Sequence, residues 1–229
     1  MRSFNFSRMF SLSLTLLFSF LSCSCAPLLT HNVAGACSSR LGSSISNFCE
    51  VTPNVLWRGS RPDKEGAAWL IQTGVRTVVN LELLLDDRPA FGRATLADAG
   101  NYSVGYYRIH DWEALPVLAP SLTDDHIAHF LAIVSQQPKP VYVHCRSGMN
   151  RTGVMVAAYR ILVEGMSEEE AIEEMSRYQG LWFEADATYI RGLSSEQREK
   201  IRQKINAWIP ELKKDAQIAC AGRVCAVSD

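Results

Sequence analysis

The sequence lacks a marked excess of charge of either sign. Its 229 residues contain 23 Lys and Arg against 24 Asp and Glu, which gives a formal net charge of -1 at pH 7. There is no basic field to follow a nucleic-acid backbone and no acidic tract typical of a solvating tail. We therefore expect no nucleic-acid partner. Because 47% of the residues are hydrophobic, a folded core is expected and disorder as the main state is excluded.

Internal repeats and a second domain are also absent from the pattern, and the N-terminal apolar run is too short for a comfortable membrane span. Arg2 and Arg8 precede this Ser-rich run, which ends in small residues at 22–26. The pattern is typical of an export signal. Residues 1–25 are therefore predicted to be a signal peptide or lipoprotein leader of an exported protein, whether periplasmic, lipid-anchored or secreted. The stretch Phe20 to Cys23 resembles a lipoprotein cleavage box, and a lipid on Cys23 would attach the protein to a membrane.

Seven cysteines are present. Two lie in the leader and Cys145 lies in a loop discussed below, which leaves Cys37, Cys49, Cys220 and Cys225. In an exported protein these four could form two disulfides. One arrangement closes two short loops, Cys37 with Cys49 and Cys220 with Cys225, whereas the other two tie the N-terminal linker to the C-terminal tail. Four free thiols would instead indicate a cytosolic protein. The sequence leaves the pairing open.

The hydrophobic pattern predicts an α/β fold. Residues 26–50 are interpreted as a linker, 51–210 as the folded domain, and 211–229 as a C-terminal tail carrying Cys220 and Cys225. Apolar, β-branched segments predict strands at 55–58, 75–81, 104–109 and 141–144, and candidate capping residues open helices at Asp63, Ser121, Ser167 and Ser194. The order of these elements predicts a central, mostly parallel sheet of four to five strands flanked by helices.

The loop that begins at Cys145 carries the strongest chemical signal. A strand ends just before it, Gly148 lies within it, and a helix is expected to begin near Thr152. Backbone N–H groups and the positive end of the helix dipole would make this loop an anion site. They would also stabilise the thiolate of Cys145, which is then a nucleophile. Arg151 can offer two parallel N–H bonds to phosphate oxygens, and the Thr152 hydroxyl is expected to bond the sulfur.

These residues resemble a known signature. His144-Cys145, followed by Gly148 and then Arg151-Thr152-Gly153, is similar to the active-site loop of the protein tyrosine phosphatase superfamily. Residues 56–63 and 74–81 resemble the opening of small atypical dual-specificity phosphatases of bacterial type, so that the resemblance covers roughly 50–208. It implies a protein tyrosine phosphatase-like fold. It also implies hydrolysis of phosphate monoesters through a phosphocysteine intermediate, without a cofactor or metal.

The resemblance further implies roles for the residues of the loop. Cys145 would be the nucleophile and Arg151 the catalytic arginine. The phosphate would be bound by Arg146, Ser147, Gly148, Met149, Asn150 and Thr152. The implied substrate is a phosphorylated protein or a small phosphate ester. Protein phosphotyrosine is the first choice, with phosphoserine and phosphothreonine as further substrates. Highly charged inositol phosphates are disfavoured because Arg146 is the one basic residue between Cys145 and Arg151.

The family mechanism requires a carboxylic acid on a loop before the cysteine, which protonates the leaving oxygen. Asp111 is the best match because it follows the strand that ends near Ile109, and Glu113 is the rival. Asp124 and Asp125 are interpreted as helix caps.

Three other residues are assigned structural roles. His144 is expected to brace the loop, and Arg58 and Arg61 are expected to be surface or packing residues, with the rim of the pocket as the alternative place for either.

Two other functions are compatible with parts of the pattern. A pseudophosphatase would bind phosphorylated ligands without turnover, but the intact Cys145 and Arg151 argue against it. A rhodanese-like sulfurtransferase also places a cysteine after a strand. Its loops usually carry one residue fewer before an arginine, whereas five residues separate Cys145 from Arg151 here. The oligomeric state cannot be inferred from the sequence. Outside the cytosol, a reactive Cys145 would be sensitive to oxidation.

Overall fold

The computed structural model of the chain describes residues 44–229, which lie in the compact unit Gly35–Asp229. The predicted leader, the lipid site at Cys23 and the disulfide candidate Cys37 lie outside the described residues. Within residues 44–229, no helix is both long enough and apolar enough to cross a membrane.

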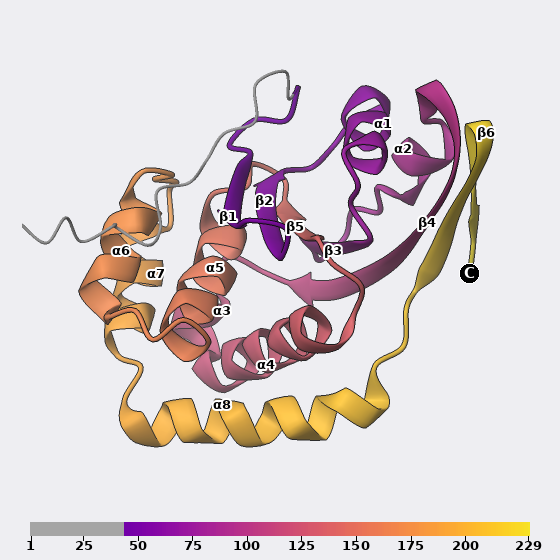
Figure 1. Cartoon of the computed structure of the whole chain (residues 1–229). Coiled ribbons are helices and arrows are strands. Elements are labelled where there is room, and N and C mark those ends of the chain that lie inside the picture. Colours follow the sequence, from indigo (N-terminus) through magenta and orange to yellow (C-terminus); the bar gives the residue numbers. More distant parts are fainter. Residues whose placement is uncertain (1–43) are drawn as a thin grey trace, which may run out of the picture. The chain divides into compact units, whose positions relative to one another are not determined.

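A six-stranded sheet with helices on both faces forms the centre of the fold (Figure 1). Its strands follow the order β1-β2-β5-β3-β4-β6. The four inner strands are mutually parallel, whereas β1 and β6 are antiparallel to their neighbours. The strands are β1 (Cys49–Thr52), β2 (Leu56–Ser60), β3 (Thr77–Glu82), β4 (Thr95–Asp111), β5 (Val141–Cys145) and β6 (Ala216–Ser228). The predicted α/β class and mostly parallel sheet are thus confirmed.

The sheet has six strands, whereas the sequence predicts four to five. The strands that were not predicted are the two edge strands, β1 and β6. β1 begins inside the expected linker 26–50, and β6 lies in the expected tail 211–229. The structured region therefore extends beyond the expected boundaries of 51 and 210. Ile45 and Phe48 are buried before β1, and Phe48 packs edge-on against Trp57 at 5.9 Å between ring centroids. Two isolated apolar residues in a polar stretch give no local signal, because their burial depends on a distant partner.

β6 pairs with β4 from Thr95↔Val224 to Tyr106↔Ala216. It then folds back on itself, so that the C-terminus returns beside the strand (Figure 1). Gly222 has φ +64°, a conformation that favours glycine, and a disulfide joins Cys220 to Cys225 across this bend. This pairing excludes the two arrangements that tie the N-terminal linker to the tail. Cys49 is also disulfide-bonded, which excludes the alternative of four free thiols.

Each face of the sheet buries its own apolar core. Side chains alternate along a strand: Val141 and Val143 of β5 face one core, and Tyr142 faces the other. The first core is covered by α4 (Pro120–Gln136), α5 (Asn150–Leu162), α6 (Glu168–Ser176), α7 (Phe183–Arg191) and α8 (Ser195–Trp208). The second is covered by α1 (Lys64–Gln72) and α2 (Arg88–Gly92). The short helix α3 (Leu115–Leu118) and a 3-10 turn (Ile209–Glu211) complete the described fold.

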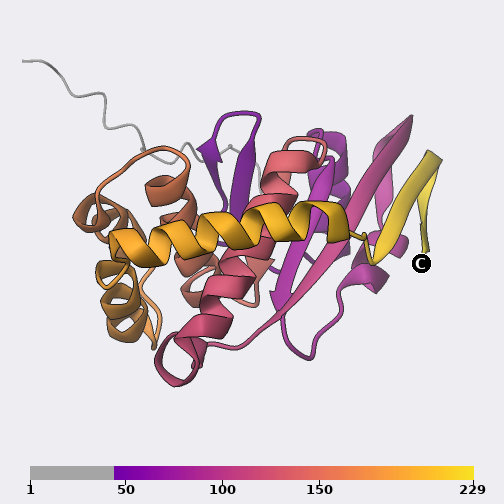
Figure 2. The same ribbon diagram turned by 90° about the horizontal axis from the view of Figure 1, so that it is seen from below.

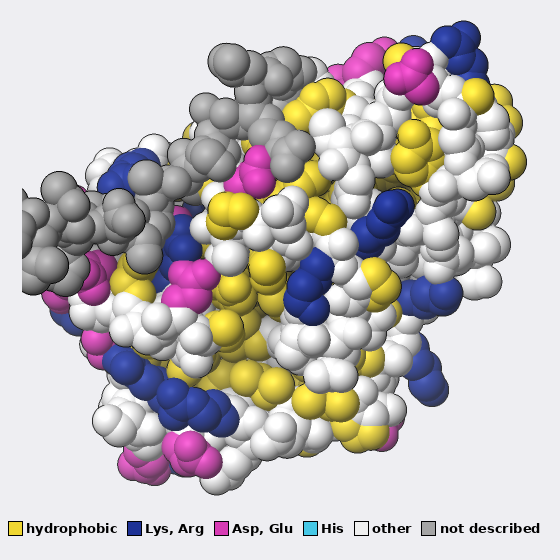
Figure 3. All heavy atoms as spheres, viewed as in Figure 1, with side chains coloured by type: hydrophobic (Ala, Val, Ile, Leu, Met, Phe, Trp, Pro, Cys, Tyr) yellow, Lys and Arg dark blue, Asp and Glu magenta, His cyan; other side chains and the backbone are white. Residues whose placement is uncertain are grey.

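Helix α8 lies across the outside of this helical layer (Figure 2). Figure 3 shows charged side chains of both signs along the lower edge, where α8 lies, and hydrophobic side chains gathered in the centre of this face. The helix is therefore amphipathic. It contributes Ile201 to the core, fully buried, and exposes Lys200 and Arg202 to solvent.

The helix starts follow local rules that were readable in the sequence. The side chain of Asp63 accepts a hydrogen bond from the Gly66 N–H at 2.7 Å. Ser167 forms a complete capping box with Glu170, and Ser194 caps α8. These three predictions are confirmed.

The caps assigned to Asp124 and Asp125 are wrong. Helix α4 begins earlier, at Pro120, so both residues lie inside it. The Oδ1 atom of Asp124 accepts hydrogen bonds from Tyr189 and Gln197, at 2.5 and 2.8 Å. Asp125 pairs with Lys204 at 3.2 Å. Both carboxylates therefore connect α4 to helices that follow it in the chain.

Candidate active site

The central loop connects β5 directly to α5. Cys145 is the last residue of β5 and is 2% exposed, and α5 begins five residues later at Asn150. Gly148 has φ +72°, and a Cβ atom at this position would lie 2.4 Å from the carbonyl carbon of Gly59. Only glycine allows the loop to approach β2 this closely. The structure therefore forms the strand, loop and helix expected of an anion site, with the thiol at its start.

Arg58, on β2, supports the loop through its side chain. It is fully buried, and its Nη2 donates a hydrogen bond to the Gly148 carbonyl at 2.5 Å. Its guanidinium lies over the ring of Tyr178, 3.9 Å from the centroid. Burial lowers the pKa of Arg58, and the negative potential of Tyr178 and Cys145 partly offsets this effect. Arg58 is thus a buried support of the loop and not a surface residue.

Arg61, the other arginine of this segment, lies at the rim of the site. It pairs with Glu82 at 3.3 Å, and its backbone N–H donates to the Arg146 carbonyl.

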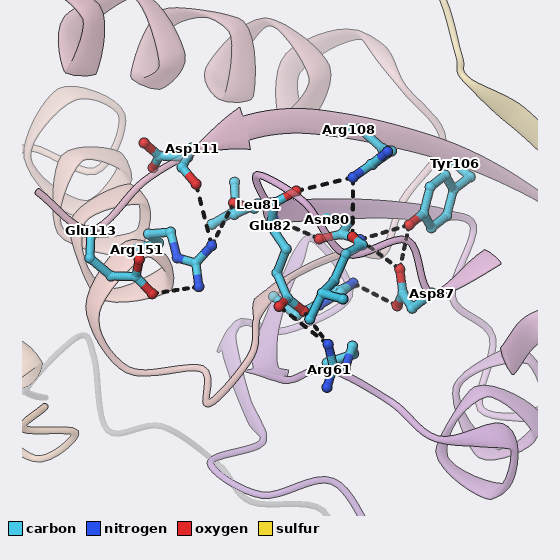
Figure 4. Close-up of polar contacts among 12 residues, drawn as sticks. Arg61, Asn80, Leu81, Glu82, Asp87, Tyr106, Arg108, Asp111, Glu113 and Arg151 are labelled. Atoms are coloured by element: carbon cyan, nitrogen blue, oxygen red, sulfur yellow. Dashed lines mark hydrogen bonds and ion pairs between the residues drawn. The ribbon is translucent and has the colours of Figure 1, made fainter. Parts of the chain in front are cut away.

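Arg151 is held by the ends of two neighbouring strands (Figure 4). Its Nη1 donates to the carbonyl oxygens of Leu81 and Asp111, at 3.2 and 3.3 Å. Its Nη2 lies 2.6 Å from Oε1 of Glu113. The buried Nε has no hydrogen-bond partner among residues 44–229. The guanidinium is therefore fixed in orientation, with two of its five N–H groups, on Nε and Nη2, not used by these contacts.

The two candidate acids are oriented differently. Asp111 is 4% exposed, and its Oδ1 accepts from the Trp112 N–H at 2.9 Å and lies 3.1 Å from His126 Nδ1. In Figure 4 its carbonyl group points toward Arg151 and its carboxylate points away. The side chain of Glu113 is 31% exposed and contacts Arg151 directly. In this conformation the carboxylate beside the arginine belongs to Glu113.

A third carboxyl group, Asp186 of α7, was not predicted. It is 1% exposed, and its Oδ2 accepts a hydrogen bond from Asn150 Nδ2 at 3.0 Å. Together with Asp111, Glu113 and Arg151 it lines a gap with no room for a water molecule. Burial, followed by the charges of Asp111 and Glu113, raises the pKa of Asp186 to about 7, against the effect of the Asn150 hydrogen bond. No motif marks this residue in the sequence, since its partner Asn150 is 36 positions away.

His144 is fully buried, as expected of a residue that braces the loop. Its Nε2 lies 3.1 Å from Oδ2 of Asp87, within ion-pair distance but without the angle of a good hydrogen bond. Asp87 Oδ1 accepts from Asn80 at 2.7 Å and from the Tyr106 hydroxyl (Figure 4). Burial by itself would raise the pKa of Asp87, but His144 and Tyr106 outweigh it and lower the pKa. The loop is thus anchored to β3 and β4 through buried polar groups.

The other predicted phosphate-binding residues lie on the same loop. Arg146 is exposed, Ser147, Met149 and Asn150 are half-buried, and Gly148 is buried. Thr152 is fully buried, and its hydroxyl has no hydrogen-bond partner within the described chain. The expected bond between Thr152 and the sulfur of Cys145 is therefore not formed in this structure.

A family model described as "DSP-PTPase phosphatase fused to NAD+ Kinase" matches residues 38–192, which include the whole loop. The chain belongs to this family of DSP-PTPase phosphatases. The match ends before α8 and β6, so these two elements lie outside the part that defines the family. The resemblance inferred from the signature loop is confirmed.

Among curated relatives, the dual specificity protein phosphatase TpbA of Pseudomonas aeruginosa (strain UCBPP-PA14) is 32% identical over 150 residues, covering 64% of this chain and 62% of TpbA. The chain thus spans less than two thirds of the length of this relative.

Solved structures extend the similarity to the fold. The crystal structure of P. aeruginosa TpbA superposes with a TM-score of 0.56 at 25% identity, covering 75% of this chain and 97% of that structure. A TpbA variant in complex with pTyr gives a TM-score of 0.54, also at 25% identity, covering 75% of this chain and 96% of that one. The dual-specificity phosphatase fold expected from the sequence is confirmed.

Proposed function

We propose that the protein is a cysteine-dependent phosphatase that hydrolyses phosphate monoesters. The observation that carries this proposal is the loop itself: a buried Cys145 at the end of β5, a close-packed Gly148, and an Arg151 fixed by strand ends. A thiolate beside backbone N–H groups and a guanidinium is arranged to attack a phosphate and stabilise its equatorial oxygens.

The reaction proceeds in two steps. In the first, the Cys145 sulfur forms a bond to phosphorus, the ester P–O bond breaks, and the leaving oxygen takes a proton from a carboxylic acid. In the second, that carboxylate removes a proton from water while the water oxygen attacks phosphorus. The S–P bond breaks, and inorganic phosphate and the thiolate are released. The negative charge that develops is stabilised by the loop N–H groups and by Arg151.

We assign the acid to Asp111, with Glu113 as the competing residue. Asp111 is the last residue of β4 and Glu113 lies on the segment that follows it, both beside Arg151. Because the carboxylate of Asp111 now contacts His126, its use as an acid requires a rotation of this segment when substrate binds; catalytic contacts of this kind commonly form only in the complex. Glu113 requires no such rotation, but it would have to leave its ion pair with Arg151.

The preferred substrate is a protein phosphotyrosine, with phosphoserine and phosphothreonine as further substrates. Support comes from the relative TpbA, a dual specificity protein phosphatase whose variant has been solved in complex with pTyr. A second support comes from the loop, where Arg146 is the single basic residue between Cys145 and Arg151. A polyphosphorylated inositol would need more basic residues to neutralise its charge, so a substrate with one phosphate is preferred.

The replacement Cys145→Ser tests the activity. It should abolish hydrolysis of p-nitrophenyl phosphate while the far-UV circular dichroism spectrum stays that of the wild type. Retained turnover would overturn the mechanism. Wild-type protein that binds phosphotyrosine without hydrolysing it would instead indicate a pseudophosphatase.

A pair of variants, Asp111→Asn and Glu113→Gln, identifies the acid. The loss of the acid should slow esters of poor leaving groups strongly and p-nitrophenyl phosphate weakly. The variant that shows this dependence on the leaving group carries the acid. If Glu113→Gln shows it and Asp111→Asn does not, the assignment to Asp111 is wrong.

We also propose that the protein is exported. In addition to the leader-like residues 1–25, support comes from Cys49, Cys220 and Cys225, which are all disulfide-bonded, whereas Cys145 is the free cysteine of the described residues. Such bridges persist outside the reducing cytosol. The intact mass of the protein from the membrane and secreted fractions would reveal cleavage near residues 23–26, or a lipid on Cys23. A full-length mass in the cytosolic fraction would contradict export.

A further inference from the structure

Exposed large hydrophobic side chains are concentrated around the catalytic loop. Eleven such side chains occur in residues 44–229. Nine of them lie in the stretches 83–85, 112–122 and 181–182, which come after β3, β4 and α6 and include α3 and the first turn of α4. We call these nine the apolar rim: Leu83, Leu84, Leu85, Trp112, Val117, Leu118, Leu122, Leu181 and Trp182. Leu84 and Leu181 are 86% and 94% exposed. An exposed apolar cluster beside a polar site is typical of a surface that binds a partner.

The topology of the sheet places this rim next to Cys145. Strands β5, β3 and β4 are adjacent and parallel, so their carboxyl ends meet at one edge of the sheet. The leucines follow β3, one strand from the loop, and Trp112 follows β4, two strands away. On the other side, Gly180 packs against Asn150, the first residue of α5, and carries Leu181 next to it. The rim therefore borders the phosphate site on more than one side.

The backbone of residues 82–85, which carries the three leucines of the apolar rim, is held in place by polar side chains. Arg108 donates to the carbonyl groups of Glu82 and Leu85, at 3.2 and 3.1 Å. Asn80 also donates to Leu85, at 3.1 Å, and His110 Nδ1 lies 3.0 Å from the Leu83 carbonyl oxygen. Figure 4 shows Asn80 and Arg108 directed at this backbone. Since the backbone is fixed by four such contacts, the outward position of the leucines is a built feature of the fold.

We propose that the apolar rim binds the residues on either side of the phosphorylated residue in a polypeptide substrate, and so favours substrates with apolar neighbours. This inference rests on the proposed phosphatase function. The phosphate loop inside the rim requires that the occupant carry a phosphate, and the rim requires that apolar groups lie beside that phosphate.

The spacing fits an extended peptide. Adjacent strands lie ~4.8 Å apart, so the rim segments begin within about 10 Å of the loop. An extended chain advances ~3.3 Å per residue, and its first three residues on each side of the phosphorylated one therefore reach the rim.

Two matched phosphotyrosine peptides test the proposal, one with Leu and Val on both sides of the phosphotyrosine and one with Ser and Gly. For the wild type, kcat/KM should be about 10-fold higher for the apolar peptide, the gain expected from partial burial of one or two leucines. In the double variant Leu84→Ser/Leu181→Ser the two peptides should be hydrolysed equally, while turnover of p-nitrophenyl phosphate stays at the wild-type level.

The matched control is Val163→Ser. Val163 is 58% exposed but follows α5, which carries it about 20 Å from the loop. This variant should retain the peptide preference. Equal kcat/KM of the wild type for both peptides, or an unchanged preference in the double variant, would overturn the proposal. So would rim-dependent sedimentation with phosphatidylcholine vesicles in the absence of a peptide preference. If no phosphate ester is hydrolysed at all, the proposed function fails instead.

Discussion

The replacement Asp186→Asn tests the electrostatics of the site through protein stability. The carboxyl group of Asp186 has a pKa of about 7 in the folded protein, against ~3.9 for an unfolded aspartate. Between these two values the folded state binds a proton that the unfolded state has lost. The stabilisation from this proton is complete below about pH 4 and is lost as the pH rises to about 7.

The size of the effect follows from the pKa difference. Three pKa units at ~1.4 kcal/mol each give a loss of about 4 kcal/mol across this window. An asparagine cannot ionise, and its side-chain oxygen can still accept the hydrogen bond that Asn150 donates. The variant should therefore match the wild type near pH 4 and be more stable by up to about 4 kcal/mol near pH 7.5.

Urea unfolding followed by circular dichroism at several pH values would measure this difference. Groups common to both proteins cancel in the comparison. The variant Asp98→Asn, at an exposed carboxylate, is the control for the loss of one surface charge. A difference between Asp186→Asn and the wild type that stays constant over the window would refute the reasoning, as would a variant that is less stable near pH 7.5.

Three further predictions concern the support of the loop and the tail. Gly148→Ala should lower kcat/KM for p-nitrophenyl phosphate at least ~100-fold, because residue 148 has φ +72° and its new Cβ atom would lie 2.4 Å from the Gly59 backbone. The matched control is Gly165→Ala, where φ is +73° but the space around the Cβ atom is open, and it should leave turnover unchanged. Arg58→Met should destabilise the fold by about 3 kcal/mol in urea unfolding, because the Gly148 carbonyl and the face of Tyr178 lose their buried partner. Cys220→Ser/Cys225→Ser should lower the stability by about 2 kcal/mol, as expected for so short a closed loop, without changing turnover. A loss of activity in that last variant would show that β6 matters for the site.

Much of the inner sheet could be predicted because its signals are local. Strands β3 and β5 are short, buried and rich in β-branched residues, and helices around the sheet carry recognisable caps such as Ser167. The catalytic loop is also local, since Cys145, Gly148 and Arg151 lie within seven consecutive residues. Their spacing follows from the geometry of one turn around one phosphate.

The features that could not be predicted depend on contacts between distant segments. Arg58 could not be placed because its partner Gly148 is 90 positions away. The carboxyl group of Asp186 meets Asn150 only after α7 has packed on α5. Asp111 was expected to face the phosphate because it lies at the right distance along the chain, but its carboxylate contacts His126 of α4, 15 positions away.

The strand β6 also bears on how the protein behaves toward other chains. A sheet edge with unpaired N–H and C=O groups can recruit a strand from another molecule and begin aggregation. In the described part of the chain, β6 pairs along β4, the longest strand, and turns back under the Cys220–Cys225 bridge, while the opposite edge is the four-residue β1. The folded protein with this bridge intact should therefore resist strand exchange with other molecules. Reduction of the Cys220–Cys225 bridge, which is remote from the catalytic loop, should promote self-association before it affects catalysis.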